Sequence, residues 1–155
     1  MTDETSDGDE IPDEVVETIQ TYIEEYHGFL SWLEVEVEEV QRTRTVMSLP
    51  FAEKLTNNTS PETIHGGVAA TLIDTCGGLA LRPHLRDPVA GGMATVNLNV
   101  NYLRRAVGDL RATAEPVRVG GSIGWSTITV ESEVPSGDVE PVVVGQAAYR
   151  LFHGD

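Results

Sequence analysis

The segment from His65 to Leu81 constrains the fold more than any other part of the chain. Its only charged side chain is Asp74. The stretch VAATLIDTCGGLAL, which starts at Val68, is apolar nearly all the way round a helical surface. This pattern is typical of a buried helix rather than of an amphipathic surface helix. We therefore expect the rest of the chain to cover this helix.

Asp74 in this helix has two interpretations. An ionised carboxylate in apolar surroundings is costly without a partner, so it often has a functional role. Ala70, Thr71, Gly77 and Gly78 lie at helical spacing from it and leave room for a ligand to approach. Alternatively, Gly77 and Gly78 end a short helix and Asp74 is a hydrogen-bonded structural acid. The residues alone leave both interpretations open.

The chain before the buried helix divides into a tail, a helix and two strands. Residues 1–10 are polar and acidic and are predicted to be disordered, whereas residues 11–155 are predicted to form a single domain. Hydrophobic spacing predicts a helix over 12–27 that Gly28 ends, strands over 33–38 and 43–49, and a loop over 50–64.

Four further strands are predicted after the buried helix, at 92–103, 109–119, 123–133 and 141–152. Turn signals rich in glycine, proline and aspartate separate them. A run of antiparallel strands around one apolar helix is an α+β layout in which the sheet covers the helix.

Charge excludes two classes of partner. The chain has 155 residues, with 25 acidic against 10 basic side chains and a net charge of −15. Such a field repels nucleic acid and anionic membrane surfaces, so we expect neither as a partner. Carboxylate excess with a single lysine, Lys54, suggests adaptation to a very salty cytoplasm, and hence a halophilic source.

Other features bound the location and the chemistry. Met1 to Glu10 is acidic rather than basic and apolar, and no apolar run reaches membrane-spanning length, so we expect a cytoplasmic protein. The single cysteine, Cys76, excludes a disulfide framework. The four histidines are scattered without metal-ligand spacing, so no metal site is expected.

The element order and the central residues resemble the hotdog-fold thioesterases of the phenylacetate-pathway type, within the 4-hydroxybenzoyl-CoA thioesterase superfamily. Members carry His-Gly-Gly at the start of the central helix and an acid nine positions later, matched here by His65-Gly66-Gly67 and Asp74. The strand that follows reads TVNLNVNYLRRA at 95–106, and the resemblance covers roughly residues 28 to 152. It implies a hotdog fold, an antiparallel sheet wrapped around one long central helix.

The resemblance also implies an activity, the hydrolysis of an acyl-CoA thioester to free acid and coenzyme A. No cofactor is implied, because coenzyme A is part of the substrate. Relatives form homodimers or homotetramers. Asp74 then corresponds to the catalytic acid, acting as general base or as nucleophile, and the sequence does not separate these routes.

The start of the helix offers an oxyanion hole. Backbone N–H groups at a helix N-terminus lack intrahelical partners, so we assign the Gly66 and Gly67 amides to this role. The alternative is a plain glycine-rich helix start. The resemblance implies that His65 positions the thioester, although an isolated histidine here is equally a cap or packing residue. The resemblance also makes Thr95 the candidate for orienting the attacking water. The alternative is that Thr95 is an ordinary threonine on a half-buried strand.

One further catalytic candidate, Asn58, lies in the loop before the helix. Relatives place an asparagine six residues before the histidine, where this chain has Thr59, and a one-residue insertion would restore the match at Asn58. A turn role for Asn58 is the alternative.

The candidates for binding coenzyme A phosphates are basic or glycine-rich. Arg104 and Arg105 close the strand after the helix, where relatives read Leu-Arg-Pro, and Arg82 follows the helix itself. Arginine suits phosphate recognition, but pairing with this protein's many carboxylates is the competing explanation. Gly120, Gly121 and Ser122 offer backbone donors, or simply a hairpin turn.

Two other functions stay open. One is an enoyl-CoA hydratase of the hotdog fold, although such enzymes pair an aspartate and a histidine about five positions apart and the motif here has no such pair. The other is a non-catalytic acyl-CoA sensor or binding domain, against which the retained Asp74 and the lack of a DNA-binding helix pair argue. The acyl group itself is not indicated by the sequence.

Overall fold

The computed structural model describes residues 10–154, so nearly all of the predicted disordered tail lies outside the described residues. Its centre is a six-stranded sheet in the order β1-β2-β6-β7-β8-β5. Every neighbouring pair of strands in this sheet is antiparallel. The strands are β1 (Glu36–Val40), β2 (Thr45–Leu49), β5 (Gly92–Tyr102), β6 (Leu110–Val119), β7 (Ile123–Glu133) and β8 (Val139–Phe152).

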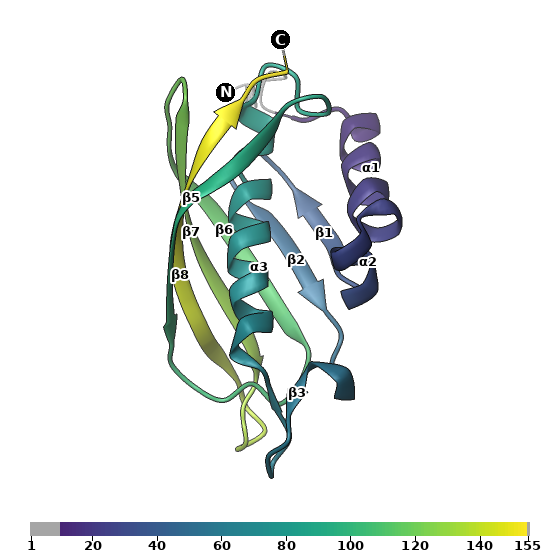
Figure 1. Cartoon of the computed structure of the whole chain (residues 1–155), viewed down its shortest axis with the longest axis vertical. Helices are drawn as coiled ribbons and strands as arrows, with labels where there is room; N and C mark the ends of the chain where they lie inside the picture. Colours follow the sequence, from purple (N-terminus) through teal and green to yellow (C-terminus); the bar gives the residue numbers. More distant parts are fainter. Residues whose placement is uncertain (1–9, 155) are drawn as a thin grey trace, which may run out of the picture.

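Helix α3 (Gly66–Leu79) lies along one face of the curved sheet (Figure 1). Leu72, Ile73 and Cys76 of this helix are fully buried against the sheet. The antiparallel sheet wrapped around one long central helix confirms the predicted α+β hotdog fold.

The two glycines of α3 do not end the helix, which continues to Leu79. The interpretation of Gly77-Gly78 as a helix stop is therefore wrong. Their role is packing: a Cβ on Gly77 would lie 2.5 Å from the hydroxyl oxygen of Tyr149 on β8 and 2.9 Å from Cδ1 of Ile128. The missing side chain lets Tyr149 approach the helix backbone.

The N-terminal region differs from the sequence prediction. Helix α1 (Asp13–Thr21) continues into a π-helical turn, η1 (Tyr22–Tyr26), but Gly28 begins another helix, α2 (Gly28–Leu33), instead of ending the first. His27 is extended and its Nδ1 accepts a hydrogen bond from the Leu30 N–H, so it caps α2. Glu34, with a φ of 68°, ends α2, and the strand expected from residue 33 starts only at Glu36.

The loop predicted over 50–64 contains short regular pieces. These are the 3-10 turn η2 (Glu53–Leu55) and a two-stranded hairpin, β3 (Thr56–Asn57) with β4 (Thr63–Ile64). A further 3-10 turn, η3 (Arg82–His84), follows α3. The hairpin leads the chain directly into the start of α3.

We expect Gly77→Ala to lower the free energy of unfolding by about 1–3 kcal/mol, because overpacking outweighs the gain of about 1 kcal/mol in helix propensity. Chemical denaturation at constant high KCl measures the change. Gly28→Ala is the matched control, since nothing lies within 4 Å of its added Cβ. Equal stability of the Gly77 variant and the wild type would contradict the close packing of α3 against β8.

Candidate active site

Asp74 is held by two residues that face each other across neighbouring strands. Thr95 on β5 and Tyr149 on β8 are directly paired, so their side chains lie on one face of the sheet. Thr95 Oγ1 donates a hydrogen bond of 2.6 Å to Asp74 Oδ1, and the Tyr149 hydroxyl donates one of 2.6 Å to the Asp74 carbonyl oxygen. The pair anchors both the carboxylate and the backbone of Asp74.

A β-bulge helps to aim Thr95. The β5–β8 register shifts between Thr95 and Asn97, so Val96 has no residue opposite it on β8. Bulges of this kind bend a strand and redirect a neighbouring side chain, and they are frequent next to active sites. The register of β5 against β8 and this bulge therefore bring Thr95 within hydrogen-bond distance of Asp74, which lies 21 residues earlier in the chain.

Tyr149 is a permanent hydrogen-bond donor. Its side chain is buried, and burial raises the pKa of the phenol above its ordinary value, with the neighbouring Asp74 charge adding to the shift. The hydroxyl thus stays protonated at physiological pH. Asp74 itself is partly exposed, and its Oδ2 makes no hydrogen bond within residues 10–154. That oxygen is available to a ligand.

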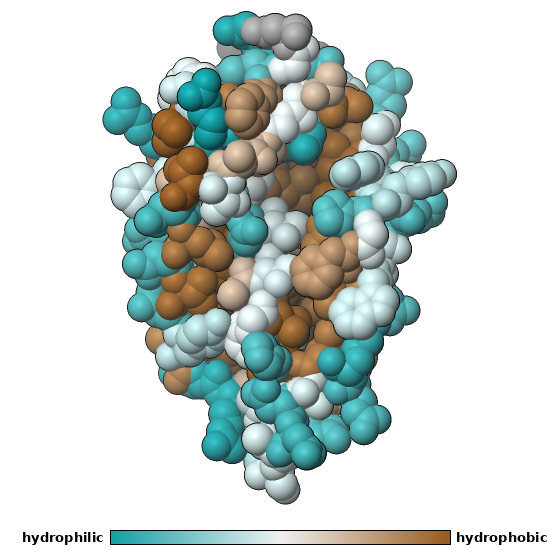
Figure 2. Space-filling model, in the orientation of Figure 1, coloured by the Kyte–Doolittle hydropathy of each residue, from teal (hydrophilic) through white to brown (hydrophobic). Residues whose placement is uncertain are grey.

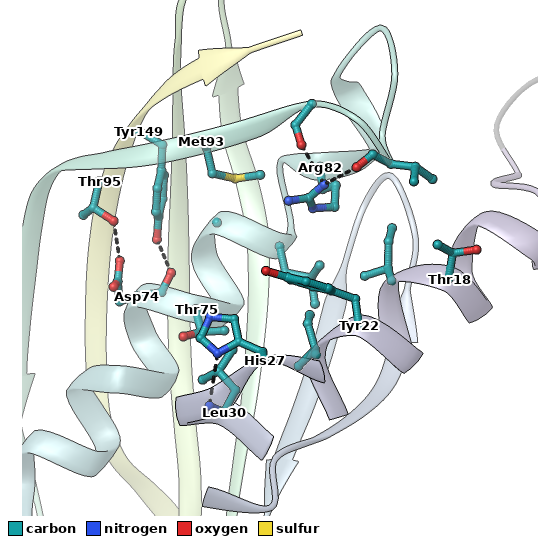
Figure 3. A pocket seen from close by; sticks show the side chains of 16 residues that line it. Thr18, Tyr22, His27, Leu30, Asp74, Thr75, Arg82, Met93, Thr95 and Tyr149 are labelled. Atoms are coloured by element: carbon teal, nitrogen blue, oxygen red, sulfur yellow. Dashed lines mark hydrogen bonds between the residues drawn. The ribbon is translucent and has the colours of Figure 1, made fainter. Parts of the chain in front are cut away.

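A cavity of about 510 Å³ opens beside Asp74 and Thr95, between α3 and the N-terminal helices (Figure 3). This volume is in the range of small-molecule sites. Its apolar lining includes Ile19, Ile23, Leu30, Leu79 and Met93. Figure 2 shows apolar side chains in the hollow on this face of the molecule.

Tyr22, His27 and Arg82 complete this cavity, and sequence reasoning did not place them there. Tyr22 falls in the helix predicted over 12–27 and was given no other role, and Arg82 was expected only as a phosphate ligand or an ion-pair partner. His27 combines a capping Nδ1 with a ring that faces the cavity (Figure 3). The scarcity of basic residues was the one signal that singled out Arg82.

At the start of α3, His65 acts as the N-cap. Its Nδ1 accepts a 2.9 Å hydrogen bond from the Gly67 N–H, which is the capping alternative raised by the sequence. The Gly66 N–H has no hydrogen-bond partner among the described residues, while the Gly66 carbonyl accepts from the Tyr102 hydroxyl at 2.7 Å. Gly66 is thus the open donor of the two predicted oxyanion-hole amides.

A second cavity, of about 410 Å³, surrounds this helix start. It brings Gly66 together with Arg104 and Arg105, two of the residues predicted to contact coenzyme A phosphates. Asn57 lines it, whereas the predicted Asn58 is exposed just after β3 and lines none of the cavities described here.

The residues predicted to contact phosphate differ in how they are engaged within the chain. Arg104 donates to the Pro141 carbonyl at 2.8 Å and lies 4.0 Å from the Glu140 carboxylate, so it has the carboxylate partner that the alternative expected. Arg105 makes no hydrogen bond or ion pair with residues 10–154. The Gly120 N–H donates to the Ile123 carbonyl and closes the β6–β7 hairpin turn.

The Gly120-Gly121-Ser122 turn and the arginine pair lie at opposite ends of α3 within one chain (Figure 1). The Asp74 carboxylate and the helix start are also separated. Nine helical residues at 1.5 Å each place Asp74 about 13 Å along the axis from His65. A single chain therefore presents the predicted site in two parts.

Other reactive groups are excluded or absent from the described part of the chain. Cys76 is buried, and burial raises the pKa of its thiol to about 12, which leaves no nucleophilic thiolate at neutral pH. No group of three or more histidine, cysteine or carboxylate side chains among residues 10–154 is placed to hold a metal ion. Within the same residues, no helix is both long and apolar enough to cross a membrane.

Comparison with known proteins identifies relatives of this chain. Residues 62–137 match the family model described as the thioesterase superfamily. A Halobacterium salinarum protein that carries a provisional esterase name is 47% identical over 146 residues, which cover 92% of this chain and 96% of that protein.

Two solved structures share the fold. A thioesterase family protein from Silicibacter pomeroyi has a TM-score of 0.76 at 18% identity, covering 90% of this chain and 99% of that chain. A thioesterase from Haemophilus influenzae has a TM-score of 0.70 at 19% identity, covering 83% of this chain and 85% of that chain.

The fold is thus of the hotdog type, and a carboxylate on its central helix opens on a cavity. The chain belongs to the thioesterase superfamily. This membership supports hydrolysis of a thioester as the class of reaction.

Proposed function

We propose that the protein hydrolyses acyl-CoA thioesters, in the manner of the phenylacetate-pathway-type thioesterases. The observation that carries the proposal is the Asp74–Thr95 pair beside a cavity of about 510 Å³ with a mixed apolar and polar lining. The cavity suits an acyl group, and the pair places a carboxylate oxygen where the thioester would enter.

Asp74 has two routes to the products. As general base, it takes a proton from a water that attacks the thioester carbon; the C–S bond then breaks, and the proton passes to the coenzyme A thiolate. As nucleophile, it attacks the thioester carbon, and the C–S bond breaks to leave a mixed anhydride on Asp74. Water then hydrolyses the anhydride to the free acid and the Asp74 carboxylate, and a proton released from this water passes to the coenzyme A thiolate. In both routes Thr95 fixes the carboxylate, and the Gly66 amide stabilises the oxyanion. The Gly67 amide joins it only if His65 releases its cap.

A second copy of the chain would unite the two parts of the site. β5 is at the end of the sheet, and its Val96 and Leu98 are 59% and 40% exposed. A long apolar edge strand is a template for pairing with another chain. Antiparallel pairing of β5 about a two-fold axis would bring the helix start of one copy toward Asp74 of the other.

The same arrangement supports a route for coenzyme A. Arg104 and Arg105 already adjoin Gly66, so phosphate groups bound there would lie beside the oxyanion donor. In an antiparallel dimer, the Gly120-Gly121-Ser122 turn of the second copy would approach this end of α3. We propose a homodimer or homotetramer with no cofactor, acting in a salty cytoplasm.

Release of free thiol from a panel of aromatic and medium-chain acyl-CoA esters tests this function. We expect turnover that rises from low to molar KCl, because salt screens repulsion within the −15 surface. Tight binding of every ester without thiol release would favour a non-catalytic binding domain. Hydration of an enoyl-CoA without hydrolysis would favour the hydratase alternative.

We expect Thr95→Val to lower kcat by about tenfold to a hundredfold with little change in KM. A hydrogen bond to a charged group contributes about 1.5–3 kcal/mol, and each 1.36 kcal/mol is a tenfold rate change. Steady-state kinetics on the best ester measures kcat and KM separately. Thr95→Ser keeps the hydroxyl and should retain most of the activity. Loss of activity in Thr95→Ser, with wild-type activity in Thr95→Val, would mean that the Thr95 methyl group matters rather than its hydrogen bond.

A further inference from the structure

Arg82 lies on the other side of the cavity from Asp74 (Figure 3). It lies three residues after the end of α3, at the first residue of η3, and it is partly buried. Although the chain has 25 acidic residues, no carboxylate within residues 10–154 forms an ion pair with it. A desolvated cation without a counter-charge is costly, so its position calls for an explanation.

The backbone orients the guanidinium through one nitrogen. Nη1 donates to the Pro88 carbonyl at 2.6 Å and to the Gly91 carbonyl at 3.0 Å. Nη2 and Nε make no hydrogen bond with the described residues. The 88–91 loop therefore fixes the plane of the guanidinium and leaves Nη2 and Nε free to donate to another acceptor. Figure 3 shows the group between this loop and the Tyr22 ring, at the edge of the cavity.

The missing countercharge is also visible in the electrostatics. Burial lowers the pKa of Arg82 below its ordinary value, with no neighbouring carboxylate to oppose the effect, although arginine stays charged at neutral pH. The interaction that opposes burial is with the phenol of Tyr22. A ligand carboxylate would supply both the charge and the two acceptor oxygens that a guanidinium binds side by side.

We propose that the acyl group of the substrate ends in a carboxylate, which Arg82 binds while Asp74 acts on the thioester. This inference rests on the proposed acyl-CoA hydrolysis and names its substrate class, mono-CoA thioesters of dicarboxylic acids. Asp74 in α3 and Arg82 in η3 lie on different sides of this one cavity, which suits an acyl chain that reaches from the thioester to the guanidinium (Figure 3). Met93, Leu79 and Ile23 line the cavity and suit its methylene groups.

The test compares suberoyl-CoA with octanoyl-CoA, which have the same chain length and differ in a terminal carboxylate. We expect wild-type kcat/KM to be at least about tenfold higher for suberoyl-CoA, as a charge-assisted hydrogen bond allows. Arg82→Gln should reduce this ratio by a similar factor, and Arg82→Lys should retain part of it. Arg111→Gln, which removes a cation paired with Glu38 elsewhere in the sheet, should leave the ratio unchanged.

Two results would overturn the inference while thioester hydrolysis stands. One is a wild type that prefers octanoyl-CoA. The other is an Arg82→Gln variant that loses activity equally on both esters, which would assign Arg82 to holding the 88–91 loop. If neither ester is hydrolysed, calorimetric binding of both to the protein still decides: tighter binding of suberoyl-CoA that depends on Arg82 supports the inference, and equal binding rejects it.

Discussion

Asp74→Asn should lower kcat by about 10²–10⁴-fold, the range that a general acid or base contributes. The amide keeps the shape of the side chain, and its oxygen can still accept the 2.6 Å hydrogen bond from Thr95. It removes the basic or nucleophilic oxygen, so binding should persist while turnover stops. Thiol release and calorimetric binding, measured on the same preparation, separate the two effects.

Asp138→Asn is the matched control for this variant. It removes one negative charge from the exposed hairpin before β8, away from the cavities described. Its activity should equal that of the wild type. Near wild-type kcat in the Asp74 variant, on any good substrate, would show that the reaction does not depend on this carboxylate.

Mixing two inactive variants should restore activity, since each chain presents only part of the proposed site. Gly66→Pro removes the open donor at the helix start, where proline is often tolerated; Asp74→Asn removes the acid. His65, with a ψ of 132°, already has the extended backbone that a following proline requires. Each mixed dimer would contain one intact site and one doubly damaged site. Random 1:1 exchange should therefore recover about a quarter of the wild-type activity.

Circular dichroism and size-exclusion chromatography are the controls for this experiment. A Cβ at position 66 would lie 3.0 Å from the Tyr102 ring, so that exposed side chain must shift slightly. Both variants must fold and exchange subunits before mixing. If they do so and the mixture stays inactive, the shared site is wrong and each chain must work alone.

Local patterning was enough to predict most of the fold. Residues 68–81 are apolar on all sides, and the later segments alternate between apolar and polar residues, so both patterns can be read from neighbouring residues alone. The structure confirms α3 and all four strands expected after it. The prediction was weakest around Gly28. A glycine is equally compatible with the end or the beginning of a helix. Here the hydrogen bond from the Leu30 N–H to His27 Nδ1 caps a new helix, so Gly28 begins α2.

The sequence by itself determined the central helix, the lone carboxylate within it and the glycine-rich helix start, because each is a property of contiguous residues. Only the tertiary structure decided what surrounds them. Thr95 reaches Asp74 through the β5–β8 register and its bulge, and the N-terminal helices close the cavity over residues more than forty positions away. It also decided that Arg82 faces this cavity without a carboxylate partner within residues 10–154. Contacts of this kind depend on how distant segments align in space, which no local pattern of polarity encodes.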